Sequence, residues 1–197
     1  LQKEKSISAL SIRSRLNQRF NGYFTPSQEL IDFCLNSYAD FDKVNGVWQL
    51  KDHETSENRR RDLVEVQQAI STLAQKFGLS CIGENPILWF NPNNPDIPAY
   101  QICLAGSAMI SRFVQKKYDQ PVESIFIFPG SRSALLRYKL DHDANLREKV
   151  SENWHFLKYR TLRQMAGRKD ISPDLWDLFI DSDPVSLEEA TQLSMFL

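Results

Sequence analysis

The spacing of apolar residues predicts two helices in the first part of the chain. Between residues 7 and 20, apolar positions mostly recur at the intervals of an amphipathic helix. A second helix start is indicated by Thr25 as the N-cap, Pro26 in the first turn and Gln28 completing a capping box. The apolar pattern carries this second helix to about Tyr38.

A short hairpin is predicted to follow these helices. Asn45-Gly46 is a strong turn signal, and residues 47–50 alternate between apolar and polar positions as a strand does. Two helices followed by an aromatic hairpin resemble the winged-helix module, so we expect residues 1–55 to form one. Winged helices contact DNA or dock on proteins, and both roles stay open at this point. If the module binds DNA, Trp48 is the candidate for stacking on it.

The clearest helical pattern in the chain covers residues 56–77 and ends at Gly78. Three consecutive cations, Arg59, Arg60 and Arg61, lie near its start. Positive charge at a helix N-terminus opposes the helix dipole, so these arginines lack a local stabilising reason to be there. They either contact phosphate groups or are neutralised by neighbouring carboxylates.

After Gly78 the pattern changes to short apolar runs bounded by Gly, Pro and Asn, each typical of a strand. A helical pattern at residues 108–118 lies between the last two runs and predicts a strand-helix-strand unit with parallel strands. We therefore expect an α/β fold, or alternatively α+β, with a mixed sheet flanked by helices. The predicted strands are 79–82, 87–90, 100–104, 124–128 and an edge strand at 154–157, and further helices are expected after Ser131, at 159–166 and after Ser172.

Composition narrows the class of protein. With 197 residues, of which 42% are hydrophobic, the chain can bury a core of its own. No apolar stretch approaches the length of a membrane span and the first residues lack the apolar centre of a secretory signal, so we expect a cytoplasmic protein without membrane contact. The cysteines Cys34, Cys81 and Cys103 have no metal-binding or disulfide spacing, and we expect them to be buried small side chains.

Charge is distributed unevenly along the chain. The formal net charge is −1, yet residues 170–197 contain seven acidic residues and no Lys or Arg. The rest of the chain is therefore basic, which indicates a polyanion such as DNA as partner or, alternatively, an ordinary solvated surface. The residues expected to contact phosphates are Arg59, Arg60, Arg61, Arg112, Lys116, Lys117, Lys158, Arg160 and Arg163.

The predicted order of helices and strands is similar to that of restriction-endonuclease-like cores. Active members of that superfamily carry a PD-(D/E)xK pattern, in which acidic groups hold a divalent metal and a lysine supports the attacking water. In NPDIPAYQICLAG, Asp96 stands for the first ligand and Gln101 for the second, but Cys103 occupies the place of the lysine. The resemblance implies a DNA context, and we predict a non-catalytic core without cofactors. A nuclease that uses Asp96, Gln101 and Mg²⁺ is the enzymatic alternative.

The sequence gives weaker evidence for any other set of catalytic residues. His53, His142 and His155 have no metal-ligand spacing, so we expect structural histidines and no metal site. The stretch FPGSRSALLR opens a helix with Gly and Ser, which fits either a simple turn and cap or a phosphate held by helix N-terminal amides.

The end of the chain, QLSMF followed by Leu197, resembles the pentapeptide with which bacterial DNA enzymes dock on the replication sliding clamp. The resemblance implies that Gln192 hydrogen-bonds at the mouth of the clamp groove and Leu193 packs at its entrance. Met195 and Phe196 would fill its apolar pocket. The alternative is that this apolar end packs against the core of its own domain.

Three longer stretches resemble an uncharacterised region of large bacterial proteins of DNA modification and restriction. They are NGVWQLKDHETSENRRRDLVEVQQAISTLAQKFG, IFIFPGSRSALLRYKL and WHFLKYRTLRQMA. Because the first residue is Leu, we also expect an upstream domain or subunit of a larger DNA-processing protein. We predict a winged-helix-like module at 1–55, a nuclease-like core at 56–169 and an acidic docking segment at 170–197. Their role would be DNA binding and docking, and a protein-interaction module without nucleic acid is the other alternative.

Overall fold

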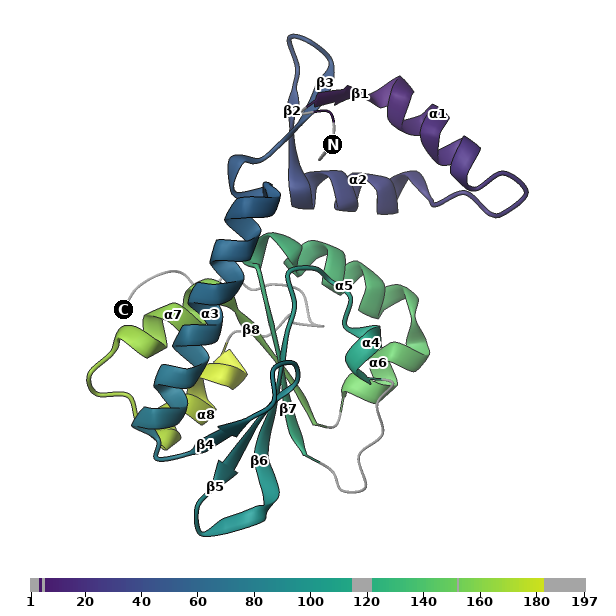
Figure 1. Ribbon diagram of the computed structural model, residues 1–197. Helices are drawn as coiled ribbons and strands as arrows, with labels where there is room; N and C mark the ends of the chain where they lie inside the picture. The colour runs from purple at the N-terminus through teal and green to yellow at the C-terminus, as the bar shows by residue number, and fades with distance from the viewer. Residues whose placement is uncertain (1–3, 5, 115–121, 152, 183–197) are drawn as a thin grey trace. The chain divides into compact units, whose positions relative to one another are not determined.

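The computed structural model describes residue 4 and residues 6–114, 122–151 and 153–182 (Figure 1). The chain divides into two compact units, Leu1–Glu65 and Val66–Leu197. The division lies inside helix α3 (Ser56–Lys76), whereas the sequence places a boundary at the start of this helix. The predicted acidic segment 170–197 is described as far as Ser182.

The first unit contains a three-stranded antiparallel sheet, with two helices between its first and second strands in chain order. Strand β3 lies in the middle and pairs with β1 on one side and β2 on the other. The two helices and the hairpin predicted here are confirmed. The elements are β1 (Ser6–Ser8), α1 (Ala9–Arg19), α2 (Gln28–Tyr38), β2 (Ala39–Asp42), β3 (Val47–Leu50) and the 3-10 turn η1 (Asp52–Glu54).

The start of α2 differs from the prediction. The backbone N–H of Leu30 donates to the hydroxyl of Ser27 over 3.2 Å, so Ser27 is the N-cap and the cap predicted at Thr25 is wrong. The residue after Pro26 is thus the one whose non-helical conformation lets its hydroxyl reach the amide three residues later.

Asp42 fixes the turn between β2 and β3. Its carboxylate accepts hydrogen bonds from the backbone N–H of Val44 at 2.9 Å and from the side-chain amide of Asn45 at 2.6 Å. The bonds from Asn45 are the main reason why the pKa of Asp42 lies below its usual value. Gly46 has a φ of 64°, a left-handed conformation that favours glycine. The turn predicted from Asn45-Gly46 is confirmed.

The second unit contains a five-stranded mixed sheet in the order β4-β5-β6-β7-β8. Neighbours are antiparallel from β4 to β6 and parallel from β6 to β8, which confirms the mixed sheet and the predicted parallel pair. The strands are β4 (Ser80–Ile82), β5 (Ile87–Asn91), β6 (Asn94–Leu104), β7 (Glu123–Phe128) and β8 (Trp154–Lys158). The helical elements after α3 are α4 (Ser111–Val114), η2 (Gly130–Arg132), α5 (Ser133–His142), α6 (Ala144–Val150), α7 (Tyr159–Gly167) and α8 (Pro173–Ser182).

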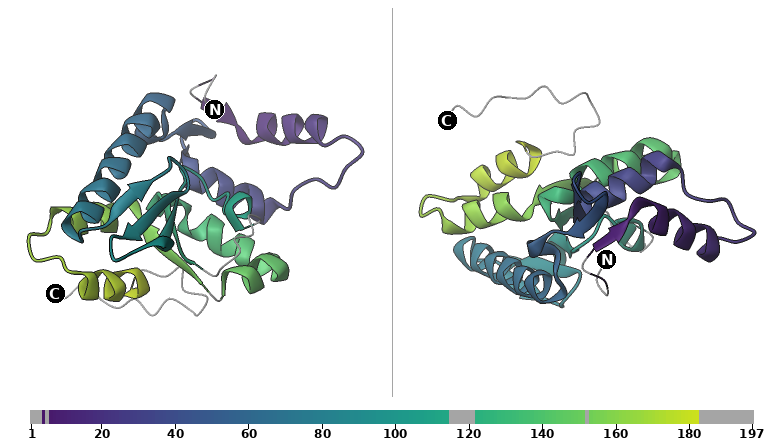
Figure 2. Two further views of the ribbon diagram at one scale, coloured as in Figure 1. Left: turned by 60° about the horizontal axis from the view of Figure 1, so that its bottom comes forward. Right: turned by 90° about the horizontal axis from the view of Figure 1, so that it is seen from above.

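Aromatic side chains pack on both faces of this sheet. On one face, Trp89 of β5 and Trp176 of α8 have ring centroids 5.3 Å apart, and both side chains are buried. On the other face, Phe113 of α4 lies 5.9 Å from Phe126 of β7. The further views show α7 and α8 next to each other at one side of the sheet (Figure 2). The core of the unit is therefore the sheet with helices on both faces.

Tyr100 joins the first of these faces to α8. Its ring lies 6.2 Å from that of Trp176, and its hydroxyl donates a hydrogen bond to Asp177 over 2.7 Å. Burial, followed by the hydrogen bond to the carboxylate, raises the pKa of Tyr100 well above its usual value. The phenol therefore stays protonated and keeps donating to Asp177 across the physiological pH range.

The expectation that all three cysteines are buried was wrong for two of them. Cys103 on β6 is buried as predicted, but Cys34 is half-buried and Cys81 on the edge strand β4 is exposed. Trp154 on the edge strand β8 is half-buried as well, whereas the tryptophans of β5 and α8 are core. An edge strand is covered less completely than an inner one, and a short apolar run does not reveal which it will be.

Asn85 extends the pairing of β5 and β6 beyond the strand. Its side-chain amide donates to the carbonyl of Leu104 over 2.8 Å, and its carbonyl oxygen accepts from the N–H of Leu104 over 3.0 Å. Asn85→Ala leaves both backbone groups without this partner, so we expect it to lower the free energy of unfolding by about 1–3 kcal/mol in denaturant titrations. Glu84→Ala, at the exposed preceding position, is the matched control. Equal losses in the two variants would contradict this role for Asn85.

Candidate nucleic-acid interface

The carboxyl ends of three parallel strands meet at one edge of the second unit's sheet. Leu104 of β6 pairs with Ile127 of β7, and Phe128 of β7 pairs with Lys158 of β8. The chain continues from these ends into residues 105–110, into η2 and into α7. In open α/β sheets ligands bind at this edge, because the loops that follow parallel strands converge there. It is therefore the place in the unit where a binding site is expected.

Hydrogen bonds hold these strand ends together. The N–H of Ala105 donates to the carbonyl of Ile127 over 3.0 Å, which continues the pairing of β6 and β7. The hydroxyl of Tyr159, the first residue of α7, donates to the carbonyl of Ala105 over 2.8 Å, and its side chain is buried. Lys139 of α5 donates to the carbonyl of Ala108 over 2.9 Å. The loop after β6 is thus fixed to both α5 and α7.

A Gly-Ser pair follows each of the first two parallel strands, Gly106-Ser107 after β6 and Gly130-Ser131 after β7. At Gly130 a Cβ atom would lie 3.6 Å from Cδ of Lys158, so the alkyl stem of this lysine passes close to the glycine backbone. The hydroxyl of Ser133 donates to the carbonyl of Gly130 over 2.8 Å and fixes the turn. Small residues thus let the cation of β8 lie close to the β7 loop.

Cations concentrate at the start of α7. This helix contains no Asp or Glu, and Arg160 and Arg163 lie on neighbouring positions three residues apart. Arg160 is exposed, and the guanidinium of Arg163 lies 5.9 Å from the ring centroid of Tyr159. With Lys158 they place three cations in six residues beside the two Gly-Ser loops. The structure therefore brings together three of the predicted phosphate-contacting residues.

The other predicted phosphate contacts lie elsewhere. Arg59, Arg60 and Arg61 occupy the first turns of α3 in the first unit, where Arg60 and Arg61 are exposed and Arg59 is half-buried. Arg112 is exposed on α4, with its guanidinium 5.8 Å from the ring centroid of Phe113. Lys116 and Lys117 lie outside the described residues.

Trp48, the predicted stacking residue, lines a pocket of the first unit instead of standing on the hairpin tip. Its ring centroid lies 5.1 Å from that of Phe41 on the neighbouring strand, and it is half-buried. The pairing of β2 with β3 sets these two residues directly opposite each other. This strand-pairing register places the indole beside the helices.

The two ligands of the nuclease alternative are not brought together. Asp96 is exposed at the start of β6, and Gln101 is buried in its inner part. Five positions along a strand at about 3.3 Å each separate them by about 16 Å, too far to share one Mg²⁺ ion. The Gln101 amide instead donates to the sulfur of Cys103 over 3.3 Å.

The histidines have local partners. Among the described residues, no three His, Cys, Asp or Glu side chains gather as a metal site would require. The closest partners are Glu54 for His53 at 3.5 Å, the carbonyl of Tyr138 for His142 at 2.8 Å, and Glu123 for His155 at 3.0 Å.

The sequence indicates the cations of this edge but not the edge itself. Gly130-Ser131 after β7 was a candidate phosphate site by itself, and no site was predicted at Gly106-Ser107 after β6. The signal that would have joined them is the repetition of Gly-Ser after two strands already predicted to be parallel. The contact of Tyr159 with Ala105 had no signal, because the two residues are far apart in the chain.

Within the described part of the chain, no helix is both long and apolar enough to cross a membrane. Comparison with protein-family models, with curated proteins and with solved structures gave no match.

Proposed function

We propose that this chain is a non-catalytic DNA-binding and docking region of a bacterial, cytoplasmic DNA-processing protein. The observation that carries the proposal is a cluster of cations at the carboxyl edge of the parallel strands. Lys158 ends β8 beside the Gly130 loop, and Arg160 and Arg163 follow on α7, a helix without acidic residues. Two of these side chains pack against neighbouring groups of the unit. The lysine stem passes along Gly130, and the Arg163 guanidinium lies near the ring of Tyr159. This combination fits the phosphate backbone of a nucleic acid.

Such a surface positions DNA without reading its sequence. Lysine and arginine contacts to phosphates release condensed counterions, so affinity should fall steeply with salt and vary little with base sequence. Glycine-containing loops favour this function because their backbone N–H groups can approach a phosphate closely.

The test compares two double variants of equal charge. Lys158→Ala/Arg160→Ala removes two proposed phosphate contacts, so the slope of log affinity against log salt should decrease by about 2. Binding is measured by fluorescence anisotropy with a labelled duplex from low to moderate salt. Arg147→Ala/Lys149→Ala removes two exposed cations of α6 and is the matched control.

The outcomes separate the hypotheses. A smaller slope in the first variant and an unchanged one in the control support binding at the carboxyl edge of the parallel strands. Equal changes of the slope in both variants would indicate general charge attraction and would contradict a specific site at this edge. The absence of any binding by the wild type at low salt would refute it and favour a protein-interaction module without nucleic acid.

We infer a winged-helix-like fold for the first unit, and the strand order β1-β3-β2 with two helices between β1 and β2 supports it.

A contact with another protein is a better hypothesis for the role of this unit than a contact with DNA. Helix α2 carries Glu29 and Asp32 and no Lys or Arg, so it would be repelled by DNA phosphates. The restriction-endonuclease-like nature of the second unit also remains a proposal, which the order of its sheet supports.

We further propose that the C-terminal peptide docks on the sliding clamp. Its residues Gln192, Leu193, Met195, Phe196 and Leu197 lie outside the described residues, so the proposal rests on their sequence. A DNA-binding surface and a clamp-docking peptide on one chain would serve the same purpose, which is to hold a larger protein on DNA.

A further inference from the structure

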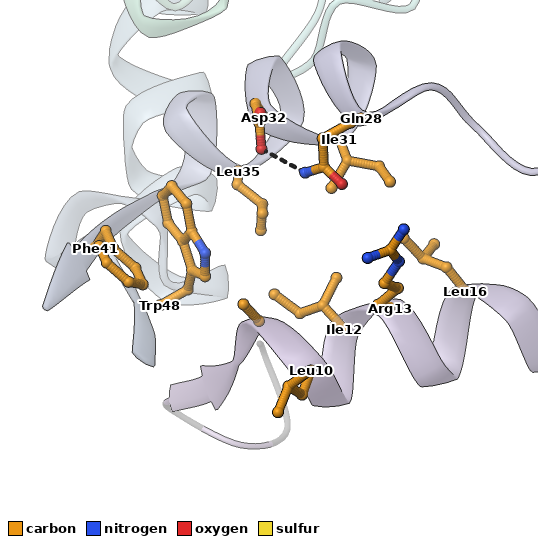
Figure 3. Close-up of a pocket in the computed structure, with 11 residues that line it drawn as sticks. Leu10, Ile12, Arg13, Leu16, Gln28, Ile31, Asp32, Leu35, Phe41 and Trp48 are labelled. Atoms are coloured by element: carbon orange, nitrogen blue, oxygen red, sulfur yellow. Dashed lines mark hydrogen bonds between the residues drawn. The ribbon is translucent and has the colours of Figure 1, made fainter. Parts of the chain in front are cut away.

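The first unit contains a pocket of about 320 Å³ between α1 and α2 (Figure 3). Leu10, Ile12 and Leu16 line it from α1, and Ile31 and Leu35 line it from α2. The hairpin closes one end with its two aromatic side chains. The lining is therefore mostly apolar, and it belongs to one unit.

The helices beside this pocket bury little of their own surface. Helix α1 has no buried residue, and in α2 the buried residue is Ser37. Leu10, one of the α1 residues beside the pocket, is 82% exposed. A helix of 11 residues is shorter than the roughly 12–15 needed for stability alone, so α1 requires a packed apolar face. A further element is expected to cover the pocket.

The charges of the two walls are opposite. Helix α1 carries Arg13, Arg15 and Arg19 and no acidic residue, whereas α2 carries Glu29 and Asp32 and no basic one. Arg13 lines the pocket from one wall and Asp32 from the other (Figure 3). A helix that fits along α2 should thus be apolar with positive flanks, and this is the chemistry of α1.

Arg13 is available for an ion pair. Arg15, on the same helix, pairs with Glu4 at 2.8 Å, whereas no ion pair joins Arg13 to another described residue. Asp32 accepts a hydrogen bond from Gln28 over 2.9 Å and retains acceptor capacity for a cation. An occupant that brings a cation to Asp32 and a carboxylate to Arg13 would give each of these two charged side chains a partner of opposite charge.

We propose that the occupant is a second copy of this chain. Helix α1 of each copy lies along α2 of the other, so that the apolar stripes meet and Arg13 pairs with Asp32 of the partner subunit. A two-fold axis makes both contacts at once, because an isologous interface uses the same surface twice. The inference names the partner for the protein-contact role proposed above for the first unit, and rests on that role.

The test is a charge swap in the full-length chain, followed by sedimentation velocity over a range of concentrations. We expect the wild type to form dimers, and Arg13→Glu and Asp32→Arg each to remain monomeric because like charges then face each other. An equimolar mixture of the two variants should regain the dimer, since opposite charges face each other at both positions. Arg19→Glu makes the same charge change on α1 outside the pocket and should leave the dimer intact.

Recovery on mixing also shows that both variants are folded. A wild type that sediments as a monomer up to high concentration overturns the inference, and so does a dimer that survives both single reversals. A monomer whose pocket instead binds an amphipathic peptide keeps the protein-contact role and refutes the second copy. DNA binding is judged separately by the salt slope, so its failure is distinguishable from failure of the dimer.

Discussion

Trp176→Ala is expected to lower the free energy of unfolding of the second unit by about 3–5 kcal/mol, the range for removal of a large buried aromatic side chain. The indole is 1% exposed and lies against three other rings, with centroid distances of 5.3 Å to Trp89, 5.9 Å to Phe77 and 6.2 Å to Tyr100. Its removal leaves a cavity between α8, the end of α3 and the sheet. The measurement is denaturant unfolding monitored by circular dichroism.

The same helix provides the control. Leu178 is 65% exposed, two residues from Trp176, so Leu178→Ala should change the free energy of unfolding by less than about 0.5 kcal/mol. A loss for Trp176→Ala no larger than that of the control would mean that α8 is not part of the core. The second unit would then depend mainly on packing at the opposite face of the sheet.

Deletion of Gln192 to Leu197 is expected to abolish binding to the bacterial sliding clamp and leave the free energy of unfolding unchanged. In the proposed role, the docking peptide would supply the apolar side chains that fill the clamp pocket and would not be needed for the core of its own domain. Surface plasmon resonance on immobilised clamp measures the binding, and the denaturant titration used for Trp176 measures the stability.

Two single substitutions refine this result. Phe196→Ala removes the ring expected in the clamp pocket, whereas Thr191→Ala changes the residue just before the motif and should bind normally. If the deletion lowers stability by several kcal/mol, the apolar end is part of the core and the docking proposal is wrong. A stable deletion variant that still binds the clamp would also refute it.

Much of the secondary structure could be predicted, because its signals are local. The helix at 56–77, the turn at Asn45-Gly46 and the main strands of the second unit were each marked by periodicity or turn residues within a few positions. Helix α6 was missed, since its seven residues contain only two buried apolar side chains, Leu146 and Val150. The wrong cap at Thr25 shows how neighbouring hydroxyl residues compete, because Ser27, two positions later, is also a favoured N-cap residue although it has no capping box.

The features that decide function depend on contacts between distant residues. The pocket of the first unit arises from the distance between α1 and α2, and this distance cannot be predicted from the residue pattern of either helix. The sequence likewise did not show that one long strand holds both Asp96 and Gln101. The sequence indicates the basic residues individually, yet only the parallel register of β6, β7 and β8 places Lys158 beside the loop at Gly130.

The cysteines offer a way to follow the opening of the second unit in solution. Cys34 is in the first unit, while Cys81 and Cys103 are in the second, and the three thiols differ in exposure. A thiol reagent can reach the sulfur of Cys103 only when the inner strand β6 opens, whereas Cys81 on the edge strand reacts in the closed state. The labelling rate at Cys103 relative to that at Cys81 therefore reports the opening of the second unit, without any engineered probe.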